Sequence, residues 1–166
     1  MIHIYCGEGK GKTTAAIGLA VRAAGAGKKV YLARFLKAYS SELESLAKIP
    51  NITVAPYPAK MKFSFLMTPE EKEEQRAFAA GILSAAFDSG ADVIVLDECC
   101  GALSAGILDL PSVLEKLGTL TEQQEAVLTG RNPPQDLCAM ADYITSMEKR
   151  VHPFDKGIRA RKGIEF

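Results

Sequence analysis

A run of glycines, lysines and threonines near the start of the chain has the residue types of a phosphate-binding loop. It reads Gly7-Glu8-Gly9-Lys10-Gly11-Lys12-Thr13-Thr14. Glycines allow a tight turn whose backbone N–H groups point at phosphate oxygens, and a helix that begins after the turn adds the positive end of its dipole. Lys12 would place a positive charge on the phosphates, and the Thr13 hydroxyl would ligate Mg²⁺. This spacing predicts a nucleotide site.

The loop is shorter than the usual phosphate-binding pattern, which has four residues between its first glycine and the Gly-Lys-Ser/Thr end. Only three residues separate Gly7 from Gly11, and Cys6 stands where the first glycine would be. A shorter loop cannot wrap phosphates in the ordinary way, so we expect a variant nucleotide site. A turn that merely connects a strand to a helix is disfavoured by the two Gly-Lys pairs and the Thr-Thr that follows.

A pair of acids, Asp97 and Glu98, ends the most apolar strand pattern of the chain, residues 91–96. An apolar strand that ends in a carboxylate, downstream of a phosphate loop, is the usual source of a second Mg²⁺ ligand. Either acid could hold the ion directly or through water. The other interpretation is that both acids cap the next segment.

Three basic residues have two interpretations each. Arg22, on the helix after the loop, could reach the nucleotide or be a solvated helix residue. Arg34 and Lys37, near the end of the second strand pattern, are open in the same way.

Two aromatic residues, Phe63 and Phe65, stand in a proline-flanked loop. They could pack as a satellite core or form an apolar wall for a large flat ligand. The adjacent Cys99 and Cys100 are expected to be packing residues, with a redox pair as the alternative. The spacing of the four cysteines fits neither a zinc site nor a disulfide framework. Reduced thiols are the default in the cytoplasm, where we expect the protein to work.

Strand and helix patterns alternate along the whole chain. Strands are predicted over residues 2–5, 29–37, 51–55, 91–96, 125–129 and 142–147, and helices over 14–26, 40–48, 69–89, 111–117 and 133–141. This alternation predicts a three-layer α/β fold of the P-loop (RecA-like) kind with a mainly parallel sheet. Ligands of such sheets bind at the carboxyl ends of the strands, where the loop, Asp97-Glu98 and Gly130-Arg131 all fall. We therefore expect one active cleft.

The length and charge balance of the chain limit the classes of partner that the sequence predicts. The chain has 166 residues, 48% of them hydrophobic, with 20 basic residues against 20 acidic ones. This length predicts a single domain spanning residues 1–166. The balanced charge favours no nucleic-acid and no membrane partner. We also expect no secretion signal, since no basic region followed by an apolar stretch stands at the start.

Over nearly its full length, the chain resembles the P-loop type of ATP:cob(I)alamin (corrinoid) adenosyltransferases, the cob(I)yrinic acid a,c-diamide adenosyltransferase family. Six blocks carry the resemblance, and the short loop together with the two tail blocks is the most specific. They are residues 7–16, Arg22-Ala23-Ala24-Gly25-Ala26-Gly27-Lys28, Val95-Leu96-Asp97-Glu98, Leu128-Thr129-Gly130-Arg131-Asn132-Pro133-Pro134, and the tail blocks at 152–157 and 160–164.

The resemblance implies transfer of the 5′-deoxyadenosyl group of ATP to the Co(I) of a corrinoid, with release of triphosphate, in adenosylcobalamin biosynthesis or salvage. It implies a nucleotide held with reversed polarity, so that the ribose 5′ carbon faces cobalt. Lys12 and the loop amides would hold the triphosphate, and Thr13 and Glu98 would position Mg²⁺. A homodimer and a flavodoxin-type or other electron donor are implied as well.

The resemblance also assigns residues to the site. Lys12, Thr13 and Glu98 are the expected catalytic residues, and Thr13, Glu98 and Asp97 the expected metal ligands. The residues expected to contact ATP or the corrinoid are Gly7, Glu8, Gly9, Lys10, Gly11, Lys12, Thr13, Thr14, Arg22, Phe63, Phe65 and Arg131.

Four features depart from the family pattern. Many members have Asn in place of Glu8, often Trp in place of Phe65, and larger residues in place of Cys99-Cys100. An N-terminal extension that covers the cleft in some members is expected to be absent, since the chain begins at its first strand. Two alternative functions stay open: an ordinary P-loop ATPase or kinase, and a non-catalytic corrinoid or nucleotide carrier.

Overall fold

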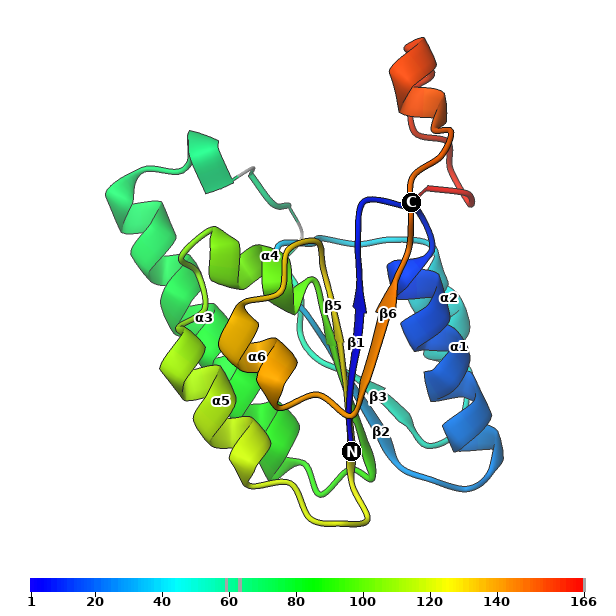
Figure 1. Cartoon of the computed structure of the whole chain (residues 1–166), viewed down its shortest axis with the longest axis vertical. Coiled ribbons are helices and arrows are strands. Elements are labelled where there is room, and N and C mark those ends of the chain that lie inside the picture. Colours follow the sequence, from blue (N-terminus) through cyan, green and yellow to red (C-terminus); the bar gives the residue numbers. More distant parts are fainter. Residues whose placement is uncertain (59, 63, 166) are drawn as a thin grey trace.

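The computed structural model describes residues 1–58, 60–62 and 64–165, and its centre is a parallel sheet between two layers of helices (Figure 1). The six strands run in the order β3-β2-β4-β5-β1-β6 across the sheet. They are β1 (Ile2–Cys6), β2 (Val30–Arg34), β3 (Ile52–Val54), β4 (Val93–Asp97), β5 (Glu125–Thr129) and β6 (Tyr143–Ser146). The predicted α/β class with a mainly parallel sheet is confirmed.

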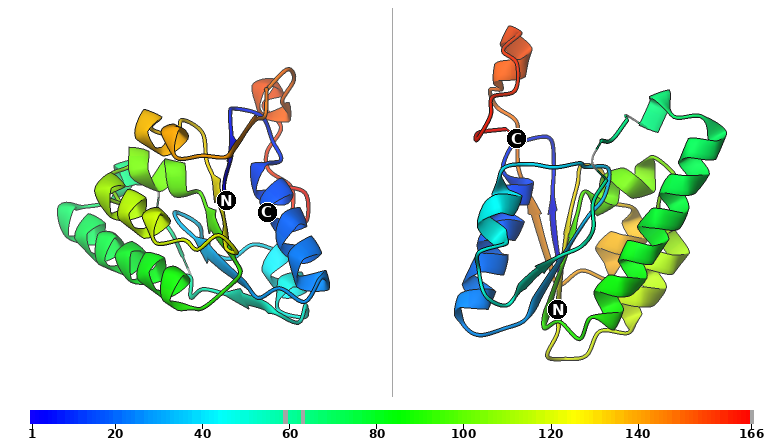
Figure 2. Two further views of the ribbon diagram at one scale, coloured as in Figure 1. Left: turned by 60° about the horizontal axis from the view of Figure 1, so that its bottom comes forward. Right: turned by 180° about the vertical axis from the view of Figure 1, so that it is seen from behind.

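Helices cover both faces of the sheet, as the two views of Figure 2 show. One face carries α1 (Lys12–Gly25) and α2 (Glu42–Leu46). The other carries α3 (Pro69–Asp88), α4 (Cys99–Ser104), α5 (Leu110–Gly118) and α6 (Gln135–Ala139). Two short 3₁₀ helices, η1 (Ser64–Leu66) and η2 (Pro153–Lys156), lie in the loop before α3 and in the C-terminal tail.

The central strand β4 is buried on both faces, as its run of apolar residues predicts for a parallel sheet. Val93 and Val95 pack in one core cluster with the alanines that form the buried stripe of α1. Ile94 and Leu96 point the other way, into the cluster beneath α3 to α6. Because successive strand residues face opposite sides, this one strand anchors both layers.

The long helix α3 begins as its sequence predicts. The Thr68 hydroxyl accepts from the Glu71 amide at 3.2 Å, and the Glu71 carboxylate accepts from the Thr68 amide at 2.9 Å. This reciprocal capping box, with Pro69 at the first helical position, satisfies N–H groups that the first turn leaves open.

Two elements differ from the prediction by more than their exact ends. The second strand ends at Arg34 rather than at residue 37, because the chain turns at Leu36, whose φ is +52°. The helix α4 was not predicted at all. It has six residues including Gly101, so its pattern is too short to stand out, and its burial of Cys99, Cys100 and Ala102 holds it against the sheet.

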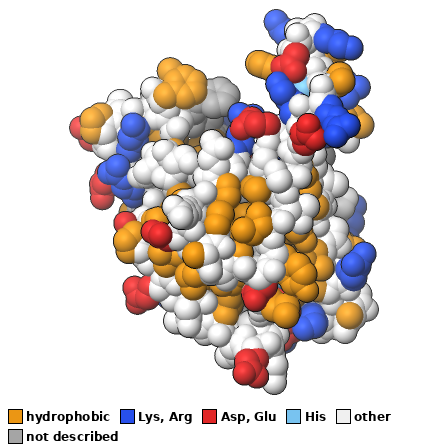
Figure 3. Space-filling model, in the orientation of Figure 1, with side chains coloured by type: hydrophobic (Ala, Val, Ile, Leu, Met, Phe, Trp, Pro, Cys, Tyr) orange, Lys and Arg blue, Asp and Glu red, His pale blue; other side chains and the backbone are white. Residues whose placement is uncertain are grey.

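After β6, which is exposed along its length, the chain continues into the tail. The tail stands apart from the body of the molecule at the upper right of Figure 3 and is dense in charged side chains. Within the described residues, no helix is both long and apolar enough to cross a membrane.

Candidate active site

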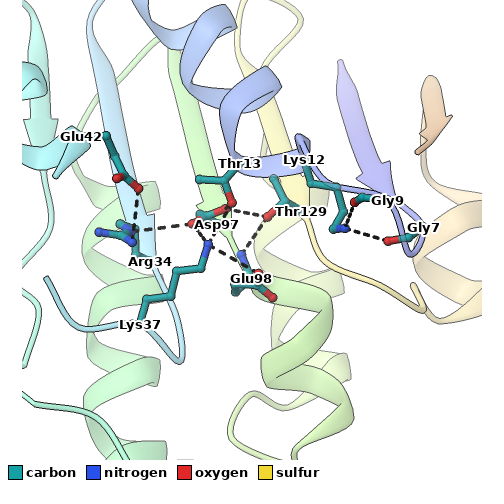
Figure 4. A network of polar contacts seen from close by, with 10 residues as sticks. All are labelled: Gly7, Gly9, Lys12, Thr13, Arg34, Lys37, Glu42, Asp97, Glu98 and Thr129. Carbon is teal, nitrogen blue, oxygen red and sulfur yellow. Dashed lines mark hydrogen bonds and ion pairs between the residues drawn. The ribbon is translucent and has the colours of Figure 1, made fainter. Parts of the chain in front are cut away.

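Three polar side chains form a row where neighbouring strands end. Arg34 of β2 pairs in register with Asp97 of β4, and Thr129 ends the next strand, β5. Thr13, in the first turn of α1, completes the group from above (Figure 4). Asp97 Oδ1 accepts hydrogen bonds from Thr13 Oγ1 at 2.8 Å and from Thr129 Oγ1 at 2.7 Å. The parallel sheet and the loop thus bring one buried carboxylate to the base of the phosphate loop.

Lys37 places an ammonium group in the middle of this cluster. Its Nζ donates to Thr13 Oγ1 and to Asp97 Oδ2, each at 2.8 Å, and lies 3.5 Å from Glu98 Oε1. The preceding residue, Leu36, has a φ of +52°, so the backbone turns just before Lys37. Sequence reasoning left the role of Lys37 open; its place just beyond a parallel strand was the available signal.

The charge of Asp97 is held by its neighbours. Burial by itself would raise the pKa of this carboxyl, which is only 1% exposed. The Lys37 ammonium and the hydrogen bonds from Lys37, Thr129 and Thr13 outweigh burial, so the pKa lies below its usual value. Asp97 is therefore a buried carboxylate whose negative charge is stabilised by its neighbours.

Arg34 is a second cation beside Asp97 and is deeply buried. Its Nε lies 3.7 Å from Asp97 Oδ2, and its Nη2 lies 3.6 Å from Glu42 Oε1. Within the described part of the chain, its Nε and Nη1 have no hydrogen-bond partner. These distances describe charge balance rather than a bidentate pair.

The phosphate loop is fixed from behind by the chain after β6. Gly9 N–H donates to the Met147 carbonyl at 2.7 Å. Gly7 has a φ of +94°, and a Cβ there would lie 2.5 Å from the same Met147 oxygen. Only glycine fits this left-handed, crowded position.

Lys12 folds back onto its own loop. Its Nζ donates to the carbonyls of Gly7 and Gly9, each at 2.7 Å (Figure 4). Burial lowers the pKa of Lys12, because desolvation disfavours the charged ammonium. At Gly11, which precedes α1, no side chain of the described residues caps the helix, and the first turn of the helix contains no acid. This arrangement suits a phosphate.

Ion pairs line the rim. Glu8 Oε2 lies 3.2 Å from Arg131 Nη1, so the charge of this acid is balanced. Lys10 Nζ lies 3.4 Å from Glu165 Oε1, so the end of the tail meets the loop. Before Arg131, Gly130 has a φ of +146°, and a Cβ there would lie 2.5 Å from Cys100 Cβ.

A cavity of about 1080 Å³ opens between the phosphate loop, the segment after β2, the η1 region and the tail. This is at the upper limit of ordinary small-molecule sites, which span about 300–1,000 Å³. Its lining includes the loop residues Glu8, Gly9, Lys10, Gly11, Lys12, Thr13 and Thr14, together with Glu98 and Arg131. Most of the predicted site residues therefore face one cleft.

Four predicted residues are not part of this lining: Gly7, Arg22, Phe65 and Asp97, which is buried. Arg22 is exposed in the last turn of α1, at the far end of the helix from Lys12. Phe65 lies in η1 next to Ser64, which lines the cavity, and is 77% exposed. Phe63 is outside the described residues.

The donor set fits magnesium. A hydroxyl from Thr13 and carboxylates from Asp97 and Glu98 surround a single point at which a cation, the Lys37 ammonium, already lies. Mg²⁺ binds hard oxygen ligands and is usually held by one or two carboxylates plus substrate phosphates. Thr13 and Glu98 line the cavity and Asp97 is buried beside them, so this donor set is of the kind that Mg²⁺ prefers.

The two adjacent cysteines behave as packing residues. Cys99 and Cys100 are fully buried, and burial raises the pKa of both thiols, that of Cys100 to about 12. Thiols of this kind stay protonated and unreactive near neutral pH.

Comparison with known proteins covers the entire chain. A sequence model of the family described as ATP:corrinoid adenosyltransferase BtuR/CobO/CobP matches residues 1–166. The chain is 33% identical over 170 residues to a corrinoid adenosyltransferase of Pseudomonas aeruginosa, covering 100% of this chain and 83% of the relative. It is 31% identical to one of Escherichia coli K12 and 29% identical to one of Salmonella typhimurium, covering 100% of this chain and 85% of each relative.

Proposed function

The chain belongs to the ATP:corrinoid adenosyltransferase family, and we propose that it transfers the 5′-deoxyadenosyl group of ATP to the Co(I) of a corrinoid, in cobalamin biosynthesis or salvage. Co(I) supplies the electron pair that forms the bond to the ribose 5′ carbon, and the carbon–oxygen bond to the phosphate breaks. Triphosphate leaves with that bond's electrons, and the cobalt ends as Co(III). The supporting observation is a shortened phosphate loop beside a buried carboxylate cluster, both on one large cavity.

The phosphate loop acts on the leaving group. As triphosphate departs, the oxygen bound to the 5′ carbon gains negative charge, and stabilising that charge lowers the barrier. Lys12 and the loop N–H groups are the donors proposed for this task. Lys12 would exchange its bonds to the carbonyls of Gly7 and Gly9 for bonds to phosphate oxygens.

Thr13, Glu98 and Asp97 are the proposed ligands of Mg²⁺, with Thr13 and Glu98 nearest the cavity. The bound ion supplies positive charge that neutralises the triphosphate. Thr129 and Arg34 keep Asp97 in place, through a hydrogen bond and through charge.

The corrinoid would lie against the side of the cavity formed by η1. Phe65 and Leu66 expose large apolar side chains there, 77% and 62% exposed, and an exposed aromatic next to a cavity suits a large flat ring. Phe63 is proposed as the second aromatic contact on the family resemblance alone. The nucleotide contact of Arg22 stays a prediction.

Further proposals follow from the family. The whole chain would work as one nucleotide-binding domain, as a homodimer, with a flavodoxin-type or other donor that supplies the electron for Co(II). Its four free cysteines fit a reducing compartment such as the cytoplasm.

Product analysis tests the proposal. The protein is incubated with Mg-ATP and a corrinoid that has been reduced chemically to Co(I), and we expect an adenosylated corrinoid and triphosphate in equal amounts. ADP or orthophosphate without adenosylation would instead identify an ordinary ATPase or kinase. Binding of both substrates without turnover under strong reductant would identify a carrier.

A further inference from the structure

The three residues proposed to hold Mg²⁺ are already bound to a cation of the protein itself. Lys37 Nζ lies 2.8 Å from Thr13 Oγ1, 2.8 Å from Asp97 Oδ2 and 3.5 Å from Glu98 Oε1 (Figure 4). Lys12, the lysine of the phosphate loop, bonds instead to the carbonyls of Gly7 and Gly9. Lys37 is therefore the lysine that neutralises the carboxylate cluster.

The ammonium and a magnesium ion cannot share this position. Mg²⁺ holds its oxygen ligands at about 2.0–2.1 Å, and the same oxygens now contact the Lys37 ammonium. Two cations this close also repel each other strongly in a partly buried site. We propose that the Lys37 ammonium takes the place of Mg²⁺ in the metal-free protein and is exchanged for the ion when Mg-ATP binds. This inference rests on the proposed magnesium site.

The backbone around Lys37 allows this exchange. Lys37 lies beyond the last residue of β2, so its movement breaks no strand pairing. Its side chain is 27% exposed and lines the cavity, which gives the ammonium a path toward bound phosphates. The preceding Leu36 has a φ of +52°, a conformation that most residues avoid and that is found disproportionately at functional sites.

Asp97 keeps its charge balanced after Lys37 leaves. A buried carboxylate stripped of its partners would be strongly destabilising. The Arg34 guanidinium, buried 3.7 Å away, remains beside it, and the Thr129 hydroxyl still donates at 2.7 Å. Arg34 is thus the permanent counter-charge and Lys37 the exchangeable one.

The exchange couples the binding of Mg²⁺ to the binding of ATP. Without ATP, Mg²⁺ must displace an ammonium that then has no equally good partner, so the metal alone binds weakly. With ATP present, the displaced ammonium gains the triphosphate, and both ligands bind more tightly together than apart. Lys37 then acts on the reaction as a phosphate-binding residue.

A substitution that removes the charge of Lys37 tests this exchange, because we expect it to strengthen the binding of Mn²⁺ and to weaken the binding of ATP. Mn²⁺ serves as the spectroscopic probe for the site, and its affinity is measured by electron paramagnetic resonance and calorimetry. In Lys37→Met without nucleotide, we expect Mn²⁺ to bind about tenfold more tightly, which corresponds to about 1.4 kcal/mol of lost competition. In the same variant, we expect ATP in the presence of Mg²⁺ to bind about tenfold more weakly.

Lys62→Met is the matched control. Lys62 also lines the cavity, and its substitution removes the same charge, but it pairs with Glu71 rather than with the cluster. We expect its Mn²⁺ affinity to equal that of the wild type. A variant Lys37→Gln, checked by thermal melting, repeats the measurement in case Lys37→Met does not fold.

The outcomes separate this inference from the proposed function. Unchanged or weaker Mn²⁺ binding in both Lys37 variants overturns the exchange while leaving adenosylation by the wild type intact. No Mn²⁺ binding in any protein, with or without ATP, overturns the metal site and the exchange together. In wild-type protein labelled with ¹³C at lysine Cε, the signal missing from Lys37→Met must shift when Mg-ATP is added; a static signal rejects the exchange.

Discussion

The two regions that flank the cavity, an inner side and an outer side, are built on different principles. On the inner side, Asp97 and Thr129 are almost fully buried and joined by a hydrogen bond of 2.7 Å at the ends of two paired strands. On the outer side, Phe65 of η1 and Phe154 of the tail are each 77% exposed. One side is continuous with the core, and the other is surface.

This difference indicates that the two sides bind different parts of the substrates. The inner side consists of strand ends and a glycine loop whose polar groups are already aimed, so the anion site is preorganised by the fold. The outer side consists of a proline-containing loop and a charged tail, which bury little without a ligand. Substitutions on the inner side should therefore affect chemistry and stability, and those on the outer side only the larger substrate.

Lys12→Ala should have the largest effect. Removing a donor aimed at developing charge costs about 10²–10³ in kcat, and we expect a loss of this size in adenosylation with pre-reduced corrinoid. Lys10→Ala serves as the control, because that lysine is exposed and pairs with the tail at 3.4 Å; its loss should be below about tenfold. If both variants lost the same fraction of kcat in steady-state assays, the proposed difference between Lys12 and Lys10 would be wrong.

Gly7→Ala should have the next largest effect, this time on stability. The added Cβ meets a backbone oxygen that cannot move aside and enters a left-handed conformation, so we expect the free energy of unfolding to fall by about 2–3 kcal/mol.

Gly157→Ala makes the matched comparison. Its φ is +71°, but no atom of the described residues lies within 4 Å of the added carbon, so we expect a smaller loss of about 1 kcal/mol. Urea denaturation measures both variants. If the tail variant were the less stable of the two, the contrast between a fixed inner side and a loose outer side would be wrong.

Phe65→Ala should leave stability unchanged and impair the corrinoid half of the reaction. We expect about a tenfold loss of activity when the assay starts from Co(II) corrinoid and little loss from pre-reduced Co(I), equivalent to about 1.4 kcal/mol. Phe154→Ala removes an equally exposed ring from the tail and should change neither assay. Equal losses of Phe65→Ala in both assays would contradict a role in reduction of the cobalt.

Alkylation of the cysteines should show the smallest effect. Because burial raises the pKa of Cys99 and Cys100, both remain protonated at pH 8 and hidden from reagent. We expect iodoacetamide to leave both unmodified in the native protein and to label both after denaturation, as read by mass spectrometry. Rapid labelling of the native protein would mean that the inner side opens.

Much of this structure could be predicted from the sequence because it depends on interactions between neighbouring residues. The glycine loop, the buried strand before Asp97 and the capped start at Thr68 depend on neighbouring residues only, and the structure has all three where they were expected. The apolar alternation of strands and helices was sufficient for the fold class because parallel sheets need helices on both faces.

Features set by turns could not be read in this way. Whether Asp97 or Glu98 bonds to Thr13 depends on the left-handed turn at Glu98, with a φ of +60°, and Lys37 reaches the cluster through the turn at Leu36. Neither residue is a glycine or an asparagine, so neither turn has a sequence signal. The helix α4 was missed because packing, rather than helix propensity, forms it.

The close contact at Gly130 sets a limit on how this protein can vary. Glu98, which precedes α4, and Arg131, which follows β5, sit on the two segments that meet where Gly130 touches Cys100. One additional carbon atom at this point would push both segments apart and displace an acid and a base of the cleft in a single step. When a library randomised at position 130 is selected for folded and active protein, we therefore expect only glycine at this position. Substitutions in the tail should be tolerated much more freely.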